Sequence, residues 1–76
     1  MGVDEMIPLS MAGTGSSVKI GQIRGKDETQ RFLASLGFVT GSMVTVVSEI
    51  NGDIIVNVKD SRVALNRMMA NKIFVS

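Results

Sequence analysis

The stretch RFLASLGFVTGSMVTVV, residues 31–47, passes from a helical pattern of apolar residues into a strand pattern, with Gly37 and Gly41 four positions apart. Gly37 falls just past the predicted helix, where a left-handed backbone is common and a Cβ costs about 1 kcal/mol or more. Phe38 can then fold back against Leu33, as in a Schellman ending. Gly41 is expected to turn the chain into the next strand. The two glycines therefore predict a helix-to-strand corner, and not a contact between packed membrane helices.

A helix is predicted before this corner, from Asp27 to Leu36. Phe32, Leu33 and Leu36 fall on one apolar stripe of such a helix. We expect Asp27 to be its N-cap, with Gln30 completing a capping box.

Strand patterns dominate the rest of the chain. Val44, Val46 and Ile50 alternate with outward residues, and Asn51-Gly52 then predicts a two-residue type I′ hairpin, because both central residues of that turn need positive φ. The predicted strands are 18–23, 42–50, 54–59, 63–65 and 73–75, with one helical turn at 66–70. We expect Gly21 to mark a bulge or bend in the first strand. The chain is therefore predicted to be mainly β: a small barrel of about five strands with one inserted α-helix and a short helical turn before the last strand.

Size and composition indicate one small globular domain. The chain has 76 residues, 45% hydrophobic and 20% charged, with a formal net charge of +1. We interpret residues 1–5 as a loose N-terminal tail and residues 6–76 as the domain. No apolar run approaches the roughly 18 to 20 residues that span a bilayer. Asp4 and Glu5 stand where a secretory signal would carry basic residues, so a soluble cytoplasmic protein is predicted, with no direct membrane insertion.

The sequence lacks the usual catalytic and metal-ligating side chains. It contains no histidine, cysteine or tyrosine. Its seven acidic residues are expected to be solvated or to favour a helix start, as Asp27 and Glu28 would. A thioether site at Met68-Met69 is the alternative to a structural role, in which Met69 fills the core and Met68 is partly exposed. We therefore predict no enzymatic activity, no cofactor and no metal site.

Two kinds of binding remain open. A small barrel can bind nucleic acid, but eight basic residues are nearly balanced by seven acids, and Phe32, Phe38 and Phe74 are all expected in the core. Arg24-Gly25-Lys26 is the one local concentration of charge. The other possibility is a protein-binding surface, for which the candidate exposed apolar residues are Met43, Val47, Ile55 and Met68.

Two motifs of this sequence resemble those of the FeoA family, small cytoplasmic accessory proteins of bacterial ferrous iron transport. The first motif is matched by Arg31, Leu33, Leu36, Gly37 and Gly41, and the second by Ala64, Leu65, Ala70, Ile73 and Val75. The resemblance implies an SH3-like barrel and a partner, the membrane transporter FeoB with its cytoplasmic G-protein domain. It implies no catalysis and no iron held by the chain itself, although the family is associated with transition metal ions. Thr40 stands where the family often has proline, which frees the backbone of the turn.

The surface around the helix and its exit is our first candidate for partner contacts. The candidate residues are Arg31, Val39 and Thr40, with Met68 as a more distant one. Arg31 could instead be an ordinary solvated helix residue, and Val39 a turn residue exposed by chance. Arg31 or Arg67 could act on GTP hydrolysis by the partner, but a structural or assembly role is favoured. Oligomeric state is left open.

Overall fold

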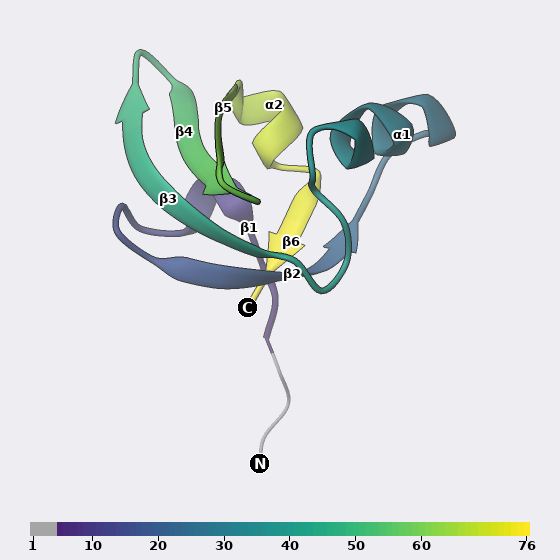
Figure 1. The fold of residues 1–76 in the computed structure, drawn as a ribbon, viewed down its shortest axis with the longest axis horizontal. Helices are drawn as coiled ribbons and strands as arrows, with labels where there is room; N and C mark the ends of the chain where they lie inside the picture. Colours follow the sequence, from purple (N-terminus) through teal and green to yellow (C-terminus); the bar gives the residue numbers. More distant parts are fainter. Residues whose placement is uncertain (1–4) are drawn as a thin grey trace.

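The computed structural model describes residues 5–76, and most of the predicted N-terminal tail, residues 1–4, lies outside the described residues. The elements in chain order are β1 (Ile7–Pro8), η1 (Leu9–Met11), β2 (Ser17–Ile23), α1 (Asp27–Ser35), β3 (Met43–Ile50), β4 (Asp53–Val58), β5 (Ser61–Leu65), α2 (Arg67–Ala70) and β6 (Ile73–Val75). The strands form one bent antiparallel sheet in the order β1-β6-β2-β3-β4-β5 (Figure 1). The mainly β fold, the inserted helix and the helical turn before the last strand are confirmed.

The described part of the chain has six strands, one more than the prediction of about five. The additional strand is β1, in which Ile7 pairs with Val75 and Pro8 with Phe74. Proline is tolerated here because β1 lies at the edge of the sheet. Backbone N–H groups on the outer side of an edge strand have no partner strand, so a proline at such a position removes no hydrogen bond of the sheet. Leu9, directly after β1, is fully buried. This burial anchors a segment that is too short to show a strand pattern.

The bulge expected at Gly21 is present in β2. The register between β2 and β6 shifts between Ile20 and Gln22. A Cβ at Gly21 would lie 2.4 Å from the Met6 sulfur, so the glycine lets the N-terminal segment approach the strand.

The β3–β4 hairpin is confirmed at Asn51 and Gly52. Their φ angles are 51° and 88°, and Ile50 pairs with Asp53 across the turn. Strand β3 also contains a bulge that the sequence pattern did not predict, a register shift between Val46 and Ser48. An extra residue moves the following side chains to the opposite face. Ile50, predicted to face inward with Val44 and Val46, is therefore 56% exposed.

Within residues 5–76, the core is formed by 13 buried apolar residues drawn from nearly every element. They are Leu9, Ile20, Leu33, Phe38, Val44, Val46, Ile54, Val56, Val58, Leu65, Ala70, Ile73 and Val75. Phe38 is fully buried as predicted, but Phe32 is 51% exposed and the prediction that it belongs to the core is wrong. Successive residues of a helix point about 100° apart around its axis. Because Leu33 points into the core and the contact between helix and sheet is narrow, the preceding Phe32 points outward. Phe74 is half-buried, and the Arg24 guanidinium lies 4.5 Å from its ring centroid.

The two helices start differently. The predicted N-cap of α1 is wrong: Asp27 is its first residue, and Lys26 holds the cap position without a side-chain hydrogen bond. Gln30 makes no capping box and instead donates from Nε2 to the Gly25 carbonyl over 3.0 Å. In α2 the Asn66 side chain accepts a bond from the Met69 N–H over 2.8 Å, which is a true N-cap.

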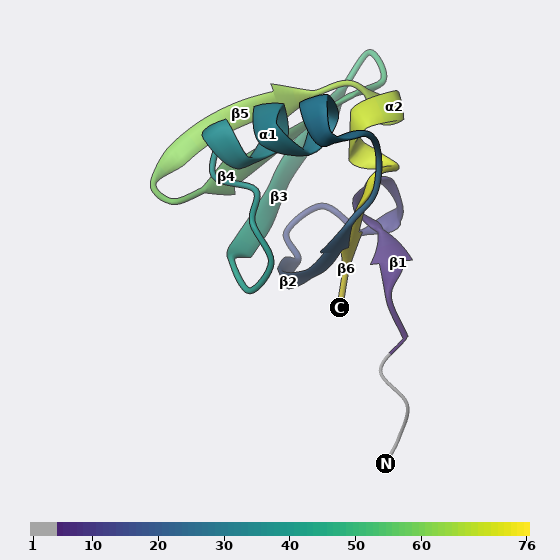
Figure 2. The same ribbon diagram turned by 90° about the vertical axis from the view of Figure 1, so that its right-hand side faces the viewer.

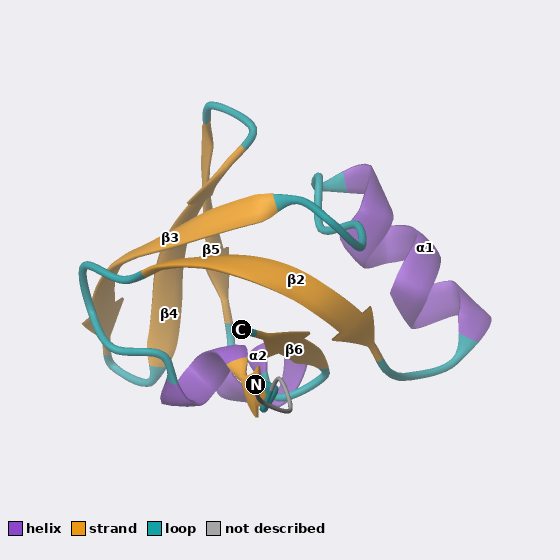
Figure 3. Cartoon of the chain, turned by 90° about the horizontal axis from the view of Figure 1, so that it is seen from below, coloured by secondary structure: helices purple, strands orange, loops and turns teal. Residues whose placement is uncertain are grey.

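Helix α1 stands at one end of the sheet. Figure 3 shows it beyond the end of β2 and the beginning of β3, joined to both by loops. Figure 2 shows α1 in front of β5 and β4. The loop from α1 into β3 therefore lies where helix and sheet meet.

Candidate partner-binding site

The end of α1 has the hydrogen bonds of a Schellman ending. Gly37 has φ 105°, its N–H donates to the Ala34 carbonyl over 3.0 Å, and the Phe38 N–H donates to the Leu33 carbonyl over 3.0 Å. Leu33 and Phe38 are both fully buried in the same core. The predicted helix ending is confirmed, and it pulls the chain from the helix into the core within two residues.

The second glycine fixes the loop to β2. Gly41 has φ 94°, and its N–H donates to the Ile20 carbonyl over 2.8 Å. The Ile20 N–H in turn donates to the Ser42 carbonyl over 2.9 Å. The Ser42 N–H donates to the Val39 carbonyl over 3.0 Å. A Cβ at Gly41 would meet no atom within 4 Å, so the backbone angle and not the space requires glycine.

This loop lines two neighbouring hollows of the surface. The smaller, about 230 Å³, is lined by Ile23, Gln30, Ala34, Phe38, Val39 and Thr40. The larger, about 500 Å³, is lined by Met6, Lys19, Ile20, Gly21, Thr40, Gly41 and Ser76. Thr40 lines both hollows. We use the name corner groove for the smaller hollow together with Thr40 and Gly41.

The predicted partner-binding residues divide between this groove and other surfaces. Val39 is half-buried and Thr40 exposed, and both line the groove. Arg31 is exposed on α1 but is not among the lining residues. Met68, 70% exposed, projects from α2 and lines neither hollow. Met43 is also exposed, at 56%, whereas Val47 and Ile55 are half-buried.

Sequence reasoning missed Gln30 and Ala34, which supply the helix wall of the groove. They lie four residues apart and so share one face of α1, next to the buried Leu33. Their positions, three residues before Leu33 and one residue after it, could have indicated that they border the buried face of the helix. This signal was hidden because Gln30 had been interpreted as a capping residue, and its side chain is instead held by the Gly25 carbonyl.

The acidic side chains of the described residues lie apart from one another. Within residues 5–76, no three or more acidic side chains gather closely enough to hold an ion. The ion pair found in that range joins Arg67 of α2 to Glu49 of β3, and both side chains are about half exposed. In the same part of the chain, no helix combines the length and the apolar composition needed to cross a membrane.

Three comparisons place the chain among known proteins. The model of the FeoA domain matches residues 7–76. A protein of Methanocaldococcus jannaschii, provisionally named Fe(2+) transport protein A, is 34% identical over 70 residues, which cover 92% of this chain and 85% of that protein.

Solved structures show the same likeness. A crystal structure of the iron uptake regulatory protein FeoA superposes with a TM-score of 0.88 at 28% identity, covering 95% of this chain and 96% of the other. The FeoA of Stenotrophomonas maltophilia, solved in complex with zinc and described as a prokaryotic SH3 domain protein, gives 0.79 at 25% identity. That match covers 96% of this chain and 91% of the other. The SH3-like fold is thereby confirmed.

Proposed function

This chain belongs to the FeoA family, and on that premise we propose that it is a cytoplasmic, non-catalytic accessory protein of ferrous iron uptake that docks on the transporter FeoB. The observation that carries the proposal is the family match, which spans residues 7–76 and so includes the corner with both glycines. The relative named for Fe(2+) transport supports the link to iron.

We place the docking surface at the corner groove. Val39 offers a half-buried apolar side chain there, and the polar residues Gln30 and Thr40 also line the groove. A recess that combines an apolar centre with polar groups at its edge is suited to receive an anchoring side chain of a partner. Arg31, exposed one residue after Gln30, would contribute at the rim, and Met68 would extend the contact only if the partner reaches α2.

The role fits assembly better than a direct effect on GTP hydrolysis. An arginine supplied to a GTPase must extend freely into its active site. Arg67 is engaged by Glu49, and Arg31 stands on helix α1 and not on an extended loop that could enter a partner's active site. We therefore expect FeoB's hydrolysis rate to change little when Arg31 or Arg67 is replaced by alanine.

Isothermal titration calorimetry with the cytoplasmic domain of FeoB tests the docking. We expect a micromolar complex, and loss of binding by about tenfold or more for Val39→Asp and Thr40→Asp, which place a charge in the recess. Ile50→Asp is the matched control, because Ile50 is an exposed apolar residue at the far end of β3. No heat at micromolar concentration contradicts docking altogether. Binding that survives both groove variants but not Met68→Asp moves the contact to α2.

A further inference from the structure

We propose that the outer face of the sheet is a second binding site, which accepts an extended, acidic protein segment with apolar residues among its carboxylates. We call this surface the sheet face and define it by Lys19, Met43, Thr45, Asn57, Lys59 and Arg62. The hollow on this face shares no lining residue with the smaller hollow of the corner groove, and the proposal does not rest on docking to FeoB.

The strand register builds the first row of the sheet face. Thr45 of β3 pairs with Asn57 of β4, and Asn57 pairs with Arg62 of β5. Ser17 of β2 pairs with Thr45 on the other side. Directly opposed residues in a sheet point to the same face. Four polar side chains therefore form a line across four strands.

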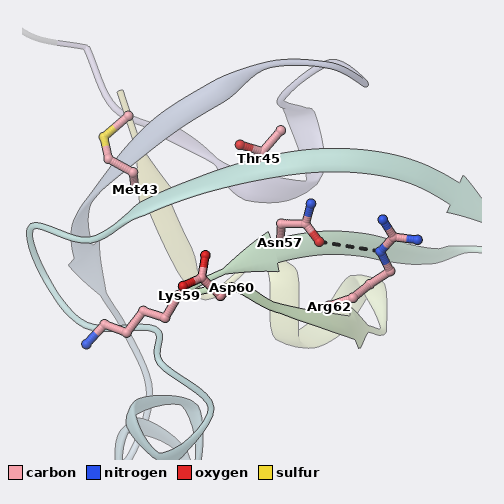
Figure 4. A pocket seen from close by; sticks show the side chains of 6 residues that line it. All are labelled: Met43, Thr45, Asn57, Lys59, Asp60 and Arg62. Carbon is pink, nitrogen blue, oxygen red and sulfur yellow. Dashed lines mark hydrogen bonds between the residues drawn. The ribbon is translucent and has the colours of Figure 1, made fainter.

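Side-chain hydrogen bonds hold both ends of this row. The Ser17 and Thr45 hydroxyls are 2.9 Å apart, and Arg62 Nε donates to Asn57 Oδ1 over 3.4 Å (Figure 4). The Asn57 contact engages Nε of the guanidinium. The two terminal nitrogens take no part in this hydrogen bond and are left to donate to a carboxylate in a bidentate pair.

A second, partly cationic row runs beside the first. Lys19 of β2 pairs with Met43, the first residue of β3, and Lys59 follows β4 in the turn into β5. Met43 is 56% exposed although it is a large apolar side chain. Between the two rows lies a hollow of about 520 Å³, lined by Met43, Thr45, Asn57, Lys59, Asp60 and Arg62 (Figure 4).

Cationic side chains outnumber acidic ones on the sheet face. The hollow is lined by two cationic side chains, Lys59 and Arg62, and by one carboxylate, Asp60, and Lys19 adds a third cation opposite Met43. The ion pair found within residues 5–76, Arg67 with Glu49, engages none of these three cations. Complementary potential favours an acidic partner. The exposed Met43 between cations favours one that also brings an apolar side chain, because interface anchors are apolar groups ringed by polar ones.

The same surface is poorly suited to nucleic acid. Single strands bind through bases that stack on aromatic side chains beside cations. Phe38 is buried, Phe74 lies under Arg24, and Phe32 projects from α1, so none of the three phenylalanines belongs to the sheet face. A peptide needs no such platform, and carboxylates can be spaced to meet Lys59 and Arg62.

An NMR titration of the ¹⁵N-labelled full chain tests the site. The probe is a synthetic peptide of about ten residues with glutamates and leucines in alternating pairs (Glu-Glu-Leu-Leu), so that each face of the extended chain carries both kinds of side chain. It is long enough to cross four strands about 4.8 Å apart. We expect shifts of the Thr45, Asn57 and Arg62 amides, with those of Val39 and Thr40 unchanged. The same peptide with glutamine for glutamate should bind about tenfold more weakly or not at all. Shifts centred on the corner groove, or equal binding of the neutral peptide, overturn the proposal.

Matched variants distinguish binding at this site from a general attraction between the acidic peptide and the basic residues of the chain. Lys59→Gln with Arg62→Gln should weaken the acidic peptide by about tenfold, whereas Lys26→Gln with Lys72→Gln removes the same charge elsewhere and should change binding less than about twofold. Equal losses in both double variants would show nonspecific attraction and overturn the site. Met43→Ser should weaken the binding of the glutamate–leucine peptide but not the binding of a peptide with glycine in place of leucine. An equal effect on both overturns the role given to Met43.

A single-stranded RNA of about ten nucleotides is titrated in parallel. Weaker binding than the acidic peptide supports the proposal. Tighter binding that is lost in the Lys59→Gln, Arg62→Gln variant overturns it in favour of nucleic acid. Because FeoB takes no part in these titrations, their outcome is independent of the calorimetry with its cytoplasmic domain.

Discussion

The corner at residues 37–41 and the hairpin tip at Asn51-Gly52 solve the same local problem in different surroundings. Both reverse the chain through glycines with positive φ, 105° at Gly37 and 88° at Gly52. A Cβ at Gly37 would lie 3.4 Å from the Val58 side chain, whereas one at Gly52 would meet nothing within 4 Å. A glycine with positive φ thus lies against a core side chain at the corner, whereas at the hairpin tip it has no neighbour. Conformation alone does not set the cost of replacing a glycine.

The largest expected difference between the two regions comes from their side chains. Phe38→Ala should lower the free energy of unfolding by about 3 to 5 kcal/mol, because it opens a cavity in a core of 13 buried residues. Ile50→Ala, at the exposed tip, should stay within about 0.5 kcal/mol. Urea unfolding followed by circular dichroism measures both. A similar loss for both variants would show that the tip is coupled to the core after all.

The glycines themselves give the next largest effect. Gly37→Ala should destabilise the fold by about 1 to 2 kcal/mol while α1 stays intact, since the left-handed ending is strained and the new methyl group meets Val58. Thermal unfolding checks the loss, and the helical signal in the far-ultraviolet checks α1. An unchanged melting temperature would refute the role of Gly37 as the helix ending.

Gly52→Ala should cost about 1 kcal/mol or less, because it adds backbone strain without a steric neighbour. The measurement is the same urea titration, with Asn51→Gly as the control, because glycine tolerates the φ of 51° at that position. If Gly52→Ala proves costlier than Gly37→Ala, the contrast drawn between an isolated and a coupled turn is wrong.

The smallest effect is expected from the ion pair beside the tip. Glu49→Gln removes the partner of Arg67, and because both side chains are about half exposed the loss should be below about 1 kcal/mol. Salt screens such exposed pairs. The difference between Glu49→Gln and the unaltered chain should therefore shrink at about 1 M NaCl, and a difference that persists there would indicate packing and not charge.

Local signals made much of the fold predictable. Asn51-Gly52 defines its turn through two neighbouring residues, and Gly37 defines the helix ending through contacts that reach back only to Leu33. The features that were missed depend on distant partners. Strand β1 exists because Ile7 meets Val75, and the β3 bulge is defined against β4. Neither leaves a periodic pattern in its own segment.

The candidate site shows the same division. Val39 and Thr40 were predicted because they follow a recognisable helix ending, and they do line the groove. Gln30 and Ala34 were missed because the face that a helix turns to a sheet depends on how the two pack. Phe32 was misplaced for that reason as well: its stripe is apolar in sequence, but the contact with the sheet is narrower than the stripe.

The position of β6 has a consequence for synthesis of the chain. It lies between β1 and β2, so both strands from the first third of the sequence wait for Ile73, Phe74 and Val75 before they gain this neighbour. Pairing between distant segments is slow, because the loop must close before any contact is gained. On the ribosome, the β2–β3–β4–β5 meander can form first, with one edge of β2 open until β6 emerges. The pairing of β6 therefore closes the long open edge of β2, and it leaves only β1 and β5 at the edges of the sheet, where neighbouring chains could pair.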